Sequence, residues 1–262
     1  MKSPGPLPVP TDWDHVADWY DYHHQEEGGA HHRQVIIPGA LRLVNCATGQ
    51  RILDIACGQG VVCRAMAHAG ASVVGVDASA NLISLARRRC RYPDRELYLS
   101  GDARKLGELP QLLPASFDSA VCILAIANMT PLSPVWQGCR RLLKTGGHLL
   151  VVMVHPCFRV PRKSSWQWDD QDRCQYRRID TYLTSEKASI AMHPGRSPAI
   201  TTTTFHRPLQ AYVNTLSSAG LLLDHVDEWA SHKAPPAGKR FEALDRSRRE
   251  IPLFLALRAR AV

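Results

Sequence analysis

The sequence predicts a single α/β domain built on a mostly parallel β-sheet. Between about residues 51 and 155, short apolar stretches alternate with helical stretches at the spacing of consecutive βαβ units. The apolar stretches are nearly continuous, as in strands that are buried on both faces. A chain of 262 residues is long enough for one such domain with insertions.

The elements follow in a regular order. Residues 1–11 are expected to form a flexible tail. Two helical pieces are expected between residues 12 and 44, broken at Gly28-Gly29, with Pro38 in the first turn of the second. Strands are then predicted at RILDIA (51–56), ASVVGVD (71–77), ELYLSGD (96–102), FDSAVCILAIAN (117–128) and HLLVVMVH (148–155), with helices over residues 61–68, 80–90 and 135–143.

After residue 155 this order breaks. Residues 156–199 are polar, basic and aromatic, and they are interpreted as an insertion rather than another crossover. Regular structure resumes at ITTTTFHRPL (200–209), followed by a helix over residues 208–219. The strand LLLDHVDEW (221–229), a loop around residues 234–240 and the strand IPLFLALRAR (251–260) complete the chain.

Charge and cysteine usage narrow the class of protein. The net charge is +8, of which +2 lies in residues 1–150 and +6 in residues 151–262. This excess suits a solvated surface, an anionic small molecule or a nucleic acid, and does not choose among them. The eight cysteines are scattered without a metal-like cluster, and no secretion signal or membrane-length apolar run is present. We therefore expect a reduced, cytoplasmic protein with no metal and no membrane partner.

The stretch RILDIACGQG ends a strand in small residues, which let the backbone approach a ligand at the start of a helix. The dinucleotide fingerprint G-x-G-x-x-G is incomplete, because Cys63 stands at its third glycine. Asp54 would oppose a pyrophosphate and favour a cation. The loop therefore suits S-adenosylmethionine, which carries a sulfonium and an ammonium, better than NAD.

Two more acids follow later strands. Asp77 ends the second strand, where a carboxylate can accept hydrogen bonds from ribose hydroxyls. Asp102 follows the third, where it could accept one from an adenine amino group. Each acid alone is more simply a helix N-cap or a solvated turn. Three acids after three successive strands favour a cofactor site.

Together, LDIACGQG, VVGVDAS, GDA, FDSAVCILAIAN and LLKTGGHLLVV resemble the consecutive motifs of class I S-adenosylmethionine-dependent methyltransferases. The resemblance covers roughly residues 50–155. Ala56 departs from it, since many members have glycine there. The resemblance implies a Rossmann-like methyltransferase fold, with a seven-stranded, mostly parallel sheet, an antiparallel last strand and, in this chain, an insertion after the fifth strand.

The resemblance also implies roles for individual residues. Asp54 and the loop residues Ala56, Cys57, Gly58 and Gly60 would lie against the methionine part of S-adenosylmethionine. Asp77 and Ala78 would bind the ribose. Adenine would be contacted by Asp102 and Ala103, and the fourth strand would line the site with Ile123, Leu124 and Ala125. The N-terminal segment looks like a lid helix, which makes Tyr20 and Arg33 candidates for the cofactor and Tyr22 and His24 for the substrate.

Methyl transfer from a sulfonium needs alignment, exclusion of water and, for some acceptors, a base. The stretch after the fourth strand is not of the (D/N)PPY type, and Pro156-Cys157 lies in the wrong place for a carbon-methylating nucleophile, so Cys157 is interpreted as a packing residue. His155 ends the fifth strand, where it could be a base or a structural histidine. His206 is a weaker catalytic candidate, and the doublets His23-His24 and His31-His32 are not expected to bind metal.

The insertion interleaves aromatic residues with arginines, which suits either a cap over a small acceptor or stacking and phosphate contacts with RNA. A cap is favoured, with Phe158, Trp166, Tyr176 and Arg177 as substrate-binding candidates. The expected parts of the one domain are residues 1–50 (tail and lid), 51–155 (cofactor core), 156–206 (cap) and 207–262 (closing helix and strands).

The sequence thus predicts methyl transfer from S-adenosylmethionine to an oxygen or nitrogen of a small molecule, by a monomer or homodimer. One alternative is an RNA or peptide methyltransferase that uses the basic C-terminal face. The other is a non-catalytic cofactor-binding protein of the same fold.

Overall fold

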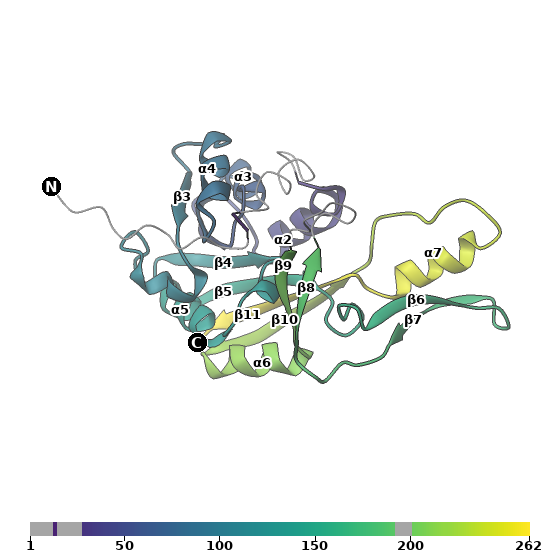
Figure 1. Ribbon diagram of the computed structural model, residues 1–262. Coiled ribbons are helices and arrows are strands. Elements are labelled where there is room, and N and C mark those ends of the chain that lie inside the picture. Colours follow the sequence, from purple (N-terminus) through teal and green to yellow (C-terminus); the bar gives the residue numbers. More distant parts are fainter. Residues whose placement is uncertain (1–12, 15–27, 192–200) are drawn as a thin grey trace.

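A seven-stranded sheet forms the centre of the protein in the computed structural model, which describes residues 13–14, 28–191 and 201–262 (Figure 1). The strand order is β10-β11-β5-β4-β1-β2-β3. These strands are β1 (Arg51–Ile55), β2 (Ser72–Asp77), β3 (Glu96–Ser100), β4 (Phe117–Ile123), β5 (Leu143–Val154), β10 (Leu221–Trp229) and β11 (Phe254–Ala261).

The pairing confirms the predicted fold class. Strands β3, β2, β1, β4 and β5 run parallel, whereas β11 is antiparallel to both β5 and β10. Because the parallel strands all point the same way, their carboxyl ends lie along one edge of the sheet. This edge is where ligands bind in open α/β sheets.

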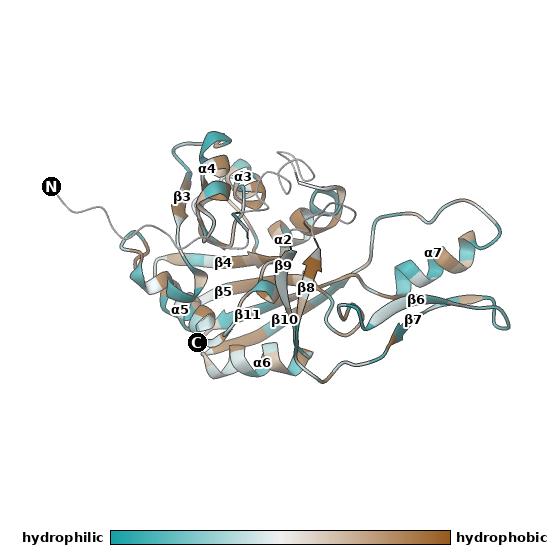
Figure 2. Ribbon diagram, in the orientation of Figure 1, coloured by the Kyte–Doolittle hydropathy of each residue, from teal (hydrophilic) through white to brown (hydrophobic). Residues whose placement is uncertain are grey.

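Helices cover both faces of the sheet, so the core has two layers. On one face α5 and α6 pack over side chains such as Leu149 and Val151, and on the other α2, α3 and α4 pack over their neighbours Leu150 and Val152. Figure 2 shows the hydrophobic residues gathered on the central strands. The helices are α2 (Ile37–Leu43), α3 (Val61–His68), α4 (Ala80–Arg88), α5 (Ser133–Leu142), α6 (Leu209–Ser218) and α7 (Phe241–Glu250), with short helical turns η1 (His32–Ile36), η2 (Ala103–Glu108) and η3 (Ile126–Asn128). No described helix is long and apolar enough to cross a membrane.

The second helix does not begin at Pro38 as expected, because the helix that begins at about Ala30 continues through Pro38 into α2. The turn before Pro38, η1, is a π-helix in which the Ile37 N–H donates to the His32 carbonyl. Widening the turn in this way accommodates a residue that has no N–H to donate. The described helix therefore starts just after Gly28-Gly29, where the break between the two helical pieces was expected. Most of the first piece lies outside the described residues.

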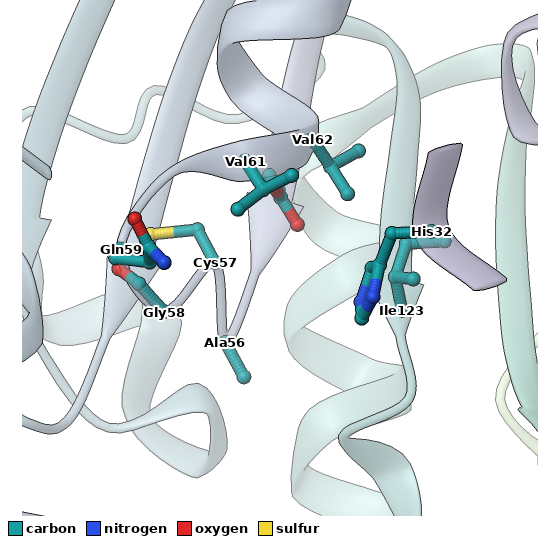
Figure 3. A pocket seen from close by; sticks show the side chains of 9 residues that line it. His32, Ala56, Cys57, Gly58, Gln59, Val61, Val62 and Ile123 are labelled. Carbon is teal, nitrogen blue, oxygen red and sulfur yellow. Dashed lines mark hydrogen bonds between the residues drawn. The ribbon is translucent and has the colours of Figure 1, made fainter. Parts of the chain in front are cut away.

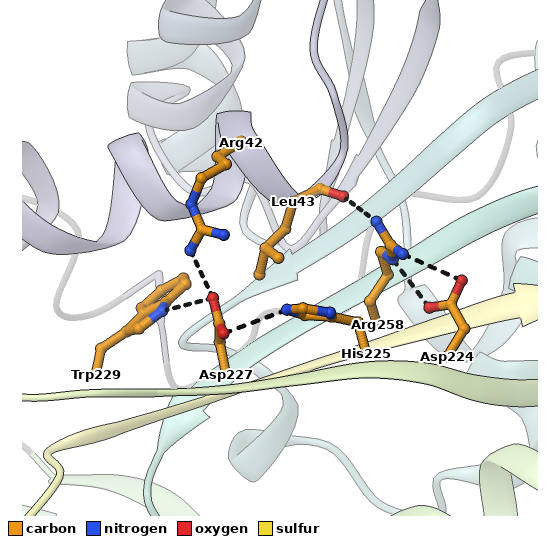
Figure 4. A network of polar contacts seen from close by, with 7 residues as sticks. All are labelled: Arg42, Leu43, Asp224, His225, Asp227, Trp229 and Arg258. Atoms are coloured by element: carbon orange, nitrogen blue, oxygen red, sulfur yellow. Dashed lines mark hydrogen bonds and ion pairs between the residues drawn. The ribbon is translucent and has the colours of Figure 1, made fainter.

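The N-terminal helix is tied to the far end of the chain (Figure 4). The Arg42 guanidinium donates to Asp227 on β10 at 2.5 Å, and Trp229 Nε1 donates to the same carboxylate at 3.3 Å. Arg258 on β11 donates to the Leu43 carbonyl at 3.0 Å. These contacts add to the packing that holds α2, and η1 before it, against the edge of the sheet.

The insertion consists of two separate ribbons. Strands β8 (Glu186–Ala191) and β9 (Thr201–His206) form one, and β9 lies beside η3 at the end of β4. Strands β6 (Ser164–Asp169) and β7 (Cys174–Ile179) form the other, which projects away from the sheet beside α7 (Figure 1). No element was predicted for the residues that form helix α7. Asp245 and Arg249 form an ion pair at 2.9 Å, and their i,i+4 spacing is one that supports a helix.

Candidate functional site

The glycine loop after β1 has a left-handed backbone at three positions. Ala56, Gly58 and Gly60 have φ angles of +57°, +55° and +82°. A Cβ added to Gly60 would lie 2.6 Å from the Tyr98 hydroxyl, whereas one added to Gly58 would meet nothing within 4 Å. Gly58 therefore presents bare backbone to open space, which is what close approach of a ligand requires.

Asp54 is a buried carboxylate at the base of this loop, with 1% of its surface exposed. The Cys63 thiol donates to its Oδ2 at 3.1 Å. Burial raises the pKa of Asp54 to about 7; the Cys63 hydrogen bond opposes this rise and the charge of Asp77 adds to it. A positively charged ligand would favour the ionised carboxylate here, in line with the expected sulfonium cofactor.

Asp77 is held in place by two backbone amides. The Gly58 N–H donates to its Oδ2 at 2.9 Å and the Ser79 N–H to its Oδ1 at 2.8 Å. Burial raises the pKa of Asp77, against the lowering effect of these hydrogen bonds. A carboxylate has about four acceptor positions, so capacity remains for ribose hydroxyls. Ala78 lies between Asp77 and Ser79, which is the N-cap of α4.

Asp102 is the N-cap of η2, which agrees with the simpler of the two interpretations given for it, an N-cap rather than an adenine contact. Its Oδ1 accepts from the Arg104 N–H at 2.8 Å, and its Oδ2 lies 2.6 Å from Arg104 Nη2. Partial burial acts to raise the pKa of Asp102, but the hydrogen bonds and charge of Arg104 hold it below its ordinary value. Asp102 and the buried Ala103 nevertheless lie at the same edge as Asp77, because the Gly101 N–H donates to the Asp77 carbonyl at 2.9 Å.

A pocket opens between the glycine loop, the end of β4 and η1 (Figure 3). Ile123 lines it as expected, whereas Leu124 and Ala125 are not among its lining residues. Leu124 is nonetheless strained, with a φ angle of +55°, a conformation that non-glycine residues rarely adopt. The lining consists of His32, Asp54, Ala56, Cys57, Gly58, Gln59, Val61, Val62 and Ile123.

His32 is a pocket residue that sequence reasoning did not assign to the site. Its ring faces the pocket opposite the loop (Figure 3), and only 9% of its surface is exposed. The π-turn that begins at His32 is a signal of functional sites, but it is invisible in a sequence. Arg33, the residue that was predicted, is exposed and donates to the Gly28 carbonyl at 3.2 Å instead. Tyr20, Tyr22 and His24 lie outside the described residues.

Both ring nitrogens of His155 are engaged. Nε2 lies 2.6 Å from Glu228 Oε1, and Nδ1 accepts from the Cys157 N–H at 3.2 Å. The ring is therefore the Nε2–H tautomer, without a free lone pair for a proton. Burial lowers the pKa of His155, and the hydrogen bond to Glu228 opposes this. With 2% of its surface exposed, His155 fits the structural alternative better than that of a base.

His206 is also buried and lies with its Nε2 at 2.7 Å from the Tyr182 carbonyl, so it ties β9 to the segment that links β7 to β8. Phe158 packs against the His155 ring at a centroid distance of 4.8 Å. The other three substrate candidates, Trp166, Tyr176 and Arg177, lie on the β6–β7 ribbon. The structure therefore brings Phe158 to the edge of the sheet and leaves these three on the projecting arm.

The described residues fit an adenosyl cofactor with a cationic end. The open backbone at Gly58, the buried carboxylate of Asp54 and the oriented carboxylate of Asp77 stand at the ends of adjacent parallel strands. No group of metal-binding side chains occurs among the described residues.

Comparisons with known proteins agree with this geometry. A protein family described as a methyltransferase domain matches residues 53–151. A ubiquinone biosynthesis O-methyltransferase from Dechloromonas aromatica is 31% identical over 39% of this chain and 44% of its own. A demethylmenaquinone methyltransferase from Tropheryma whipplei is 30% identical over 45% of this chain and 47% of its own. The matches thus span less than half of these relatives.

A solved structure extends the similarity to most of the chain. An S-adenosylmethionine-dependent methyltransferase from Mesorhizobium loti is 28% identical, with a TM-score of 0.64, over 85% of this chain and 96% of its own. The similarity therefore includes the strands and helices on either side of the region that the sequence relatives share.

Proposed function

Because the chain belongs to the class I S-adenosylmethionine-dependent methyltransferases, we propose that it transfers a methyl group from S-adenosylmethionine to an oxygen or nitrogen of a small-molecule acceptor. The observation that carries the proposal is the pocket that joins the glycine loop to Asp54 and Ile123. When bound, this cofactor supplies a methyl group that is already activated by a sulfonium.

The residues of the chain then have to bind and orient the cofactor and the acceptor, and they have to exclude water. Asp54 would balance the positive charge of the methionine part from beneath the loop. Asp77, already oriented by the Gly58 and Ser79 amides, would accept from the ribose hydroxyls. Ile123 provides an apolar wall at the end of β4. Alignment of this kind can supply much of the rate acceleration of a displacement.

A small acceptor is supported by two observations. The relatives named above include a ubiquinone biosynthesis O-methyltransferase and a demethylmenaquinone methyltransferase. In addition, the β8–β9 ribbon lies beside η3, where the Thr204 hydroxyl donates to the Ala127 carbonyl at 3.4 Å. A ribbon there would limit the size of the acceptor. We keep residues 156–206 as the proposed cap, with β8–β9 as the part next to the site.

The test of the cofactor site is Asp77→Ala. We expect this variant to lose about 1.5–3 kcal/mol of binding free energy for S-adenosylhomocysteine, because charge-assisted hydrogen bonds to the ribose are removed. Isothermal titration calorimetry measures the change, and Asp118→Ala, an acid at the start of β4, is the control that should bind normally. An unchanged affinity of Asp77→Ala would contradict the placement of the ribose.

RNA remains a second candidate acceptor because of a basic concavity between the β6–β7 ribbon and α7. Trp168 and Phe241 line it together with Arg173, Lys239 and Arg246, and none of these three cations forms an ion pair with a described residue. Methylation of an RNA pool that falls steeply with salt would favour this candidate, whereas salt-tolerant methylation of a metabolite pool would favour the small molecule. Tight cofactor binding without methylation of either pool would favour the non-catalytic alternative.

A further inference from the structure

Two arginines at the base of the β6–β7 ribbon contact the same aromatic ring. The Arg159 Cζ lies 5.0 Å from the centroid of Trp166, and the Arg177 Cζ lies 5.4 Å from it. Neither guanidinium forms an ion pair with any carboxylate in the described parts of the chain. We call these two residues the arginine pair.

The hydrogen-bonding capacity of the arginine pair is only partly used. Arg177 donates to the Phe158 carbonyl at 2.7 Å and to the Ser164 hydroxyl at 2.8 Å. Arg159 reaches only the carbonyls of Ile251 and Pro252, at 3.5 and 3.4 Å, longer than ordinary hydrogen bonds. Its Nε is buried without a partner among the described residues.

The two positive charges also repel each other. Burial, with a further contribution from the charge of Arg177, lowers the pKa of Arg159 to about 10. Arginine is otherwise charged at every pH that proteins experience. An anion next to both guanidiniums would remove this repulsion and supply acceptors for the unused N–H groups.

The arginine pair lies beyond the same edge of the sheet as the pocket. Ile123, which lines the pocket, pairs with Val152 on β5. His155 follows three residues later, and the Arg159 N–H donates to its carbonyl at 2.9 Å. Only β4 separates β5 from β1, so the ends of these two strands are about 10 Å apart.

We propose that the arginine pair binds an anionic group of the methyl acceptor, either a carboxylate or a phosphoryl group. This inference rests on the proposed function, since it assigns a chemical class to the substrate of that site. The planar guanidinium forks match the oxygens of both groups, and the Trp166 ring supplies an apolar wall next to them. The acceptor would therefore carry its negative charge at one end and its methylated atom toward the pocket.

The experiment measures binding of inorganic phosphate and of succinate by calorimetry, at constant ionic strength, with S-adenosylhomocysteine saturating its own site. We expect one of the two anions to bind the wild-type protein more tightly than chloride, and which one does so distinguishes phosphoryl from carboxylate acceptors. Arg159→Gln should weaken that binding about tenfold or more, and Arg159→Lys by less, because lysine keeps the charge but loses the fork.

Arg178→Gln is the matched control. Arg178 neighbours Arg177 on β7 but points to the other face of the ribbon and pairs with Asp180 at 2.6 Å, so its loss should leave anion binding unchanged. Normal S-adenosylhomocysteine affinity shows that each variant is folded. If Arg159→Gln does not fold, Arg159→Lys still tests the inference.

The inference is overturned if neither anion binds the wild-type protein better than chloride. It is also overturned if Arg159→Gln binds the anion as tightly as the wild type does. Failure of S-adenosylhomocysteine to bind the wild-type protein would instead overturn the proposed function, so the two failures are distinguishable.

Discussion

A single carboxylate, Asp54, dominates the electrostatics of the glycine loop. Without a ligand its burial favours the protonated form near neutral pH, since its pKa is raised to about 7. A cationic ligand reverses this preference. Binding of the ligand and release of the Asp54 proton are therefore linked, and affinity should rise as the pH increases from 6 to 8.

Asp54→Asn should stabilise the unliganded protein at alkaline pH. The unfolded chain releases this proton near pH 4 and the folded protein near pH 7, so the folded state binds more protons in between. The free energy of unfolding therefore falls in this window as the pH rises. We expect the advantage of asparagine to grow by about 2 kcal/mol between pH 5 and 8, as measured by urea unfolding.

The same variant should bind S-adenosylhomocysteine weakly and without the pH dependence of the wild type. Asp118→Asn is a control for the stability measurement, with an effect of opposite sign. Partial burial acts to raise the pKa of Asp118, but the hydrogen bond and charge of Lys144 outweigh it and the pKa is lowered. Asparagine at this position should therefore lose stability relative to the wild type as the pH rises. Stability curves of wild type and Asp54→Asn that run parallel between pH 5 and 8 would contradict the role given to Asp54.

His155→Ala should affect stability more than binding. The substitution leaves the Cys157 N–H and the Glu228 carboxylate without their partner. We expect the free energy of unfolding to fall by about 1–3 kcal/mol while cofactor affinity stays within a factor of two. Unfolding and calorimetry measure the two effects. Wild-type stability with turnover reduced by about 10²–10⁴ would restore the interpretation of His155 as a base.

At the candidate site, residue types could indicate the acids but not the backbone conformation. Asp54 and Asp77 were expected at the site because, with Asp102, they make three acids after three successive strands. The left-handed conformations of Ala56 and Leu124 could not be predicted, since neither residue favours them. Such strain is set by the surrounding packing and is common at functional sites.

At the scale of elements, the N-terminal helix is fixed mainly by packing. The ion pair between Arg42 and Asp227 is partly exposed, and such pairs contribute about 1 kcal/mol or less. Gly39, by contrast, lies so close to Trp229 that an added Cβ would come within 2.4 Å of the indole. The absence of a side chain at Gly39 therefore sets the distance between α2 and β10.

Gly39→Ala should destabilise the protein although alanine is the better helix former. The gain in helix propensity is about 1 kcal/mol, whereas overpacking costs about 1–3 kcal/mol and a rigid indole cannot yield. We expect a net loss in thermal unfolding and weaker cofactor binding, because the displaced helix carries His32. In Gly138→Ala of α5 the new Cβ would meet the Leu106 side chain at 3.2 Å, a milder overlap, so this control should be destabilised less. Equal effects of the two substitutions would contradict this account.

Periodicity predicted elements where local and tertiary preferences agree. The helix expected over residues 61–68 is α3 (Val61–His68), and all five strands of the parallel part were found. Periodicity failed where long-range contacts determine the local structure. Pro38 suggested a helix start but is absorbed by a π-turn, and α7 is strongly polar, with its helical form supported by contacts with β7.

For the whole molecule, the edge of the sheet where the pocket opens could be predicted from the sequence, whereas the division of the insertion into two ribbons could not. Aromatic and basic residues look alike whether they cap a site or project from it. Trp166 was expected in a cap over the acceptor, and it lies at the base of the projecting arm, where its ring contacts Arg159 and Arg177. Composition indicates the chemistry of a segment, whereas the position of the segment in the fold depends on strands and helices that are distant in the sequence.

The strand order has a consequence for synthesis on the ribosome. Strand β11 is inserted between β10 and β5, and the bond from Arg42 to Asp227 spans 185 residues of sequence. A nascent chain emerges N-terminus first, so the helix that carries His32 can pack on α3 and β5 but lacks its contacts with β10 and β11 until these strands have left the exit tunnel. The glycine loop and its neighbouring strands can form earlier. The polar contacts that hold the His32 side of the pocket to the end of the chain are therefore completed only after the last strands have been made.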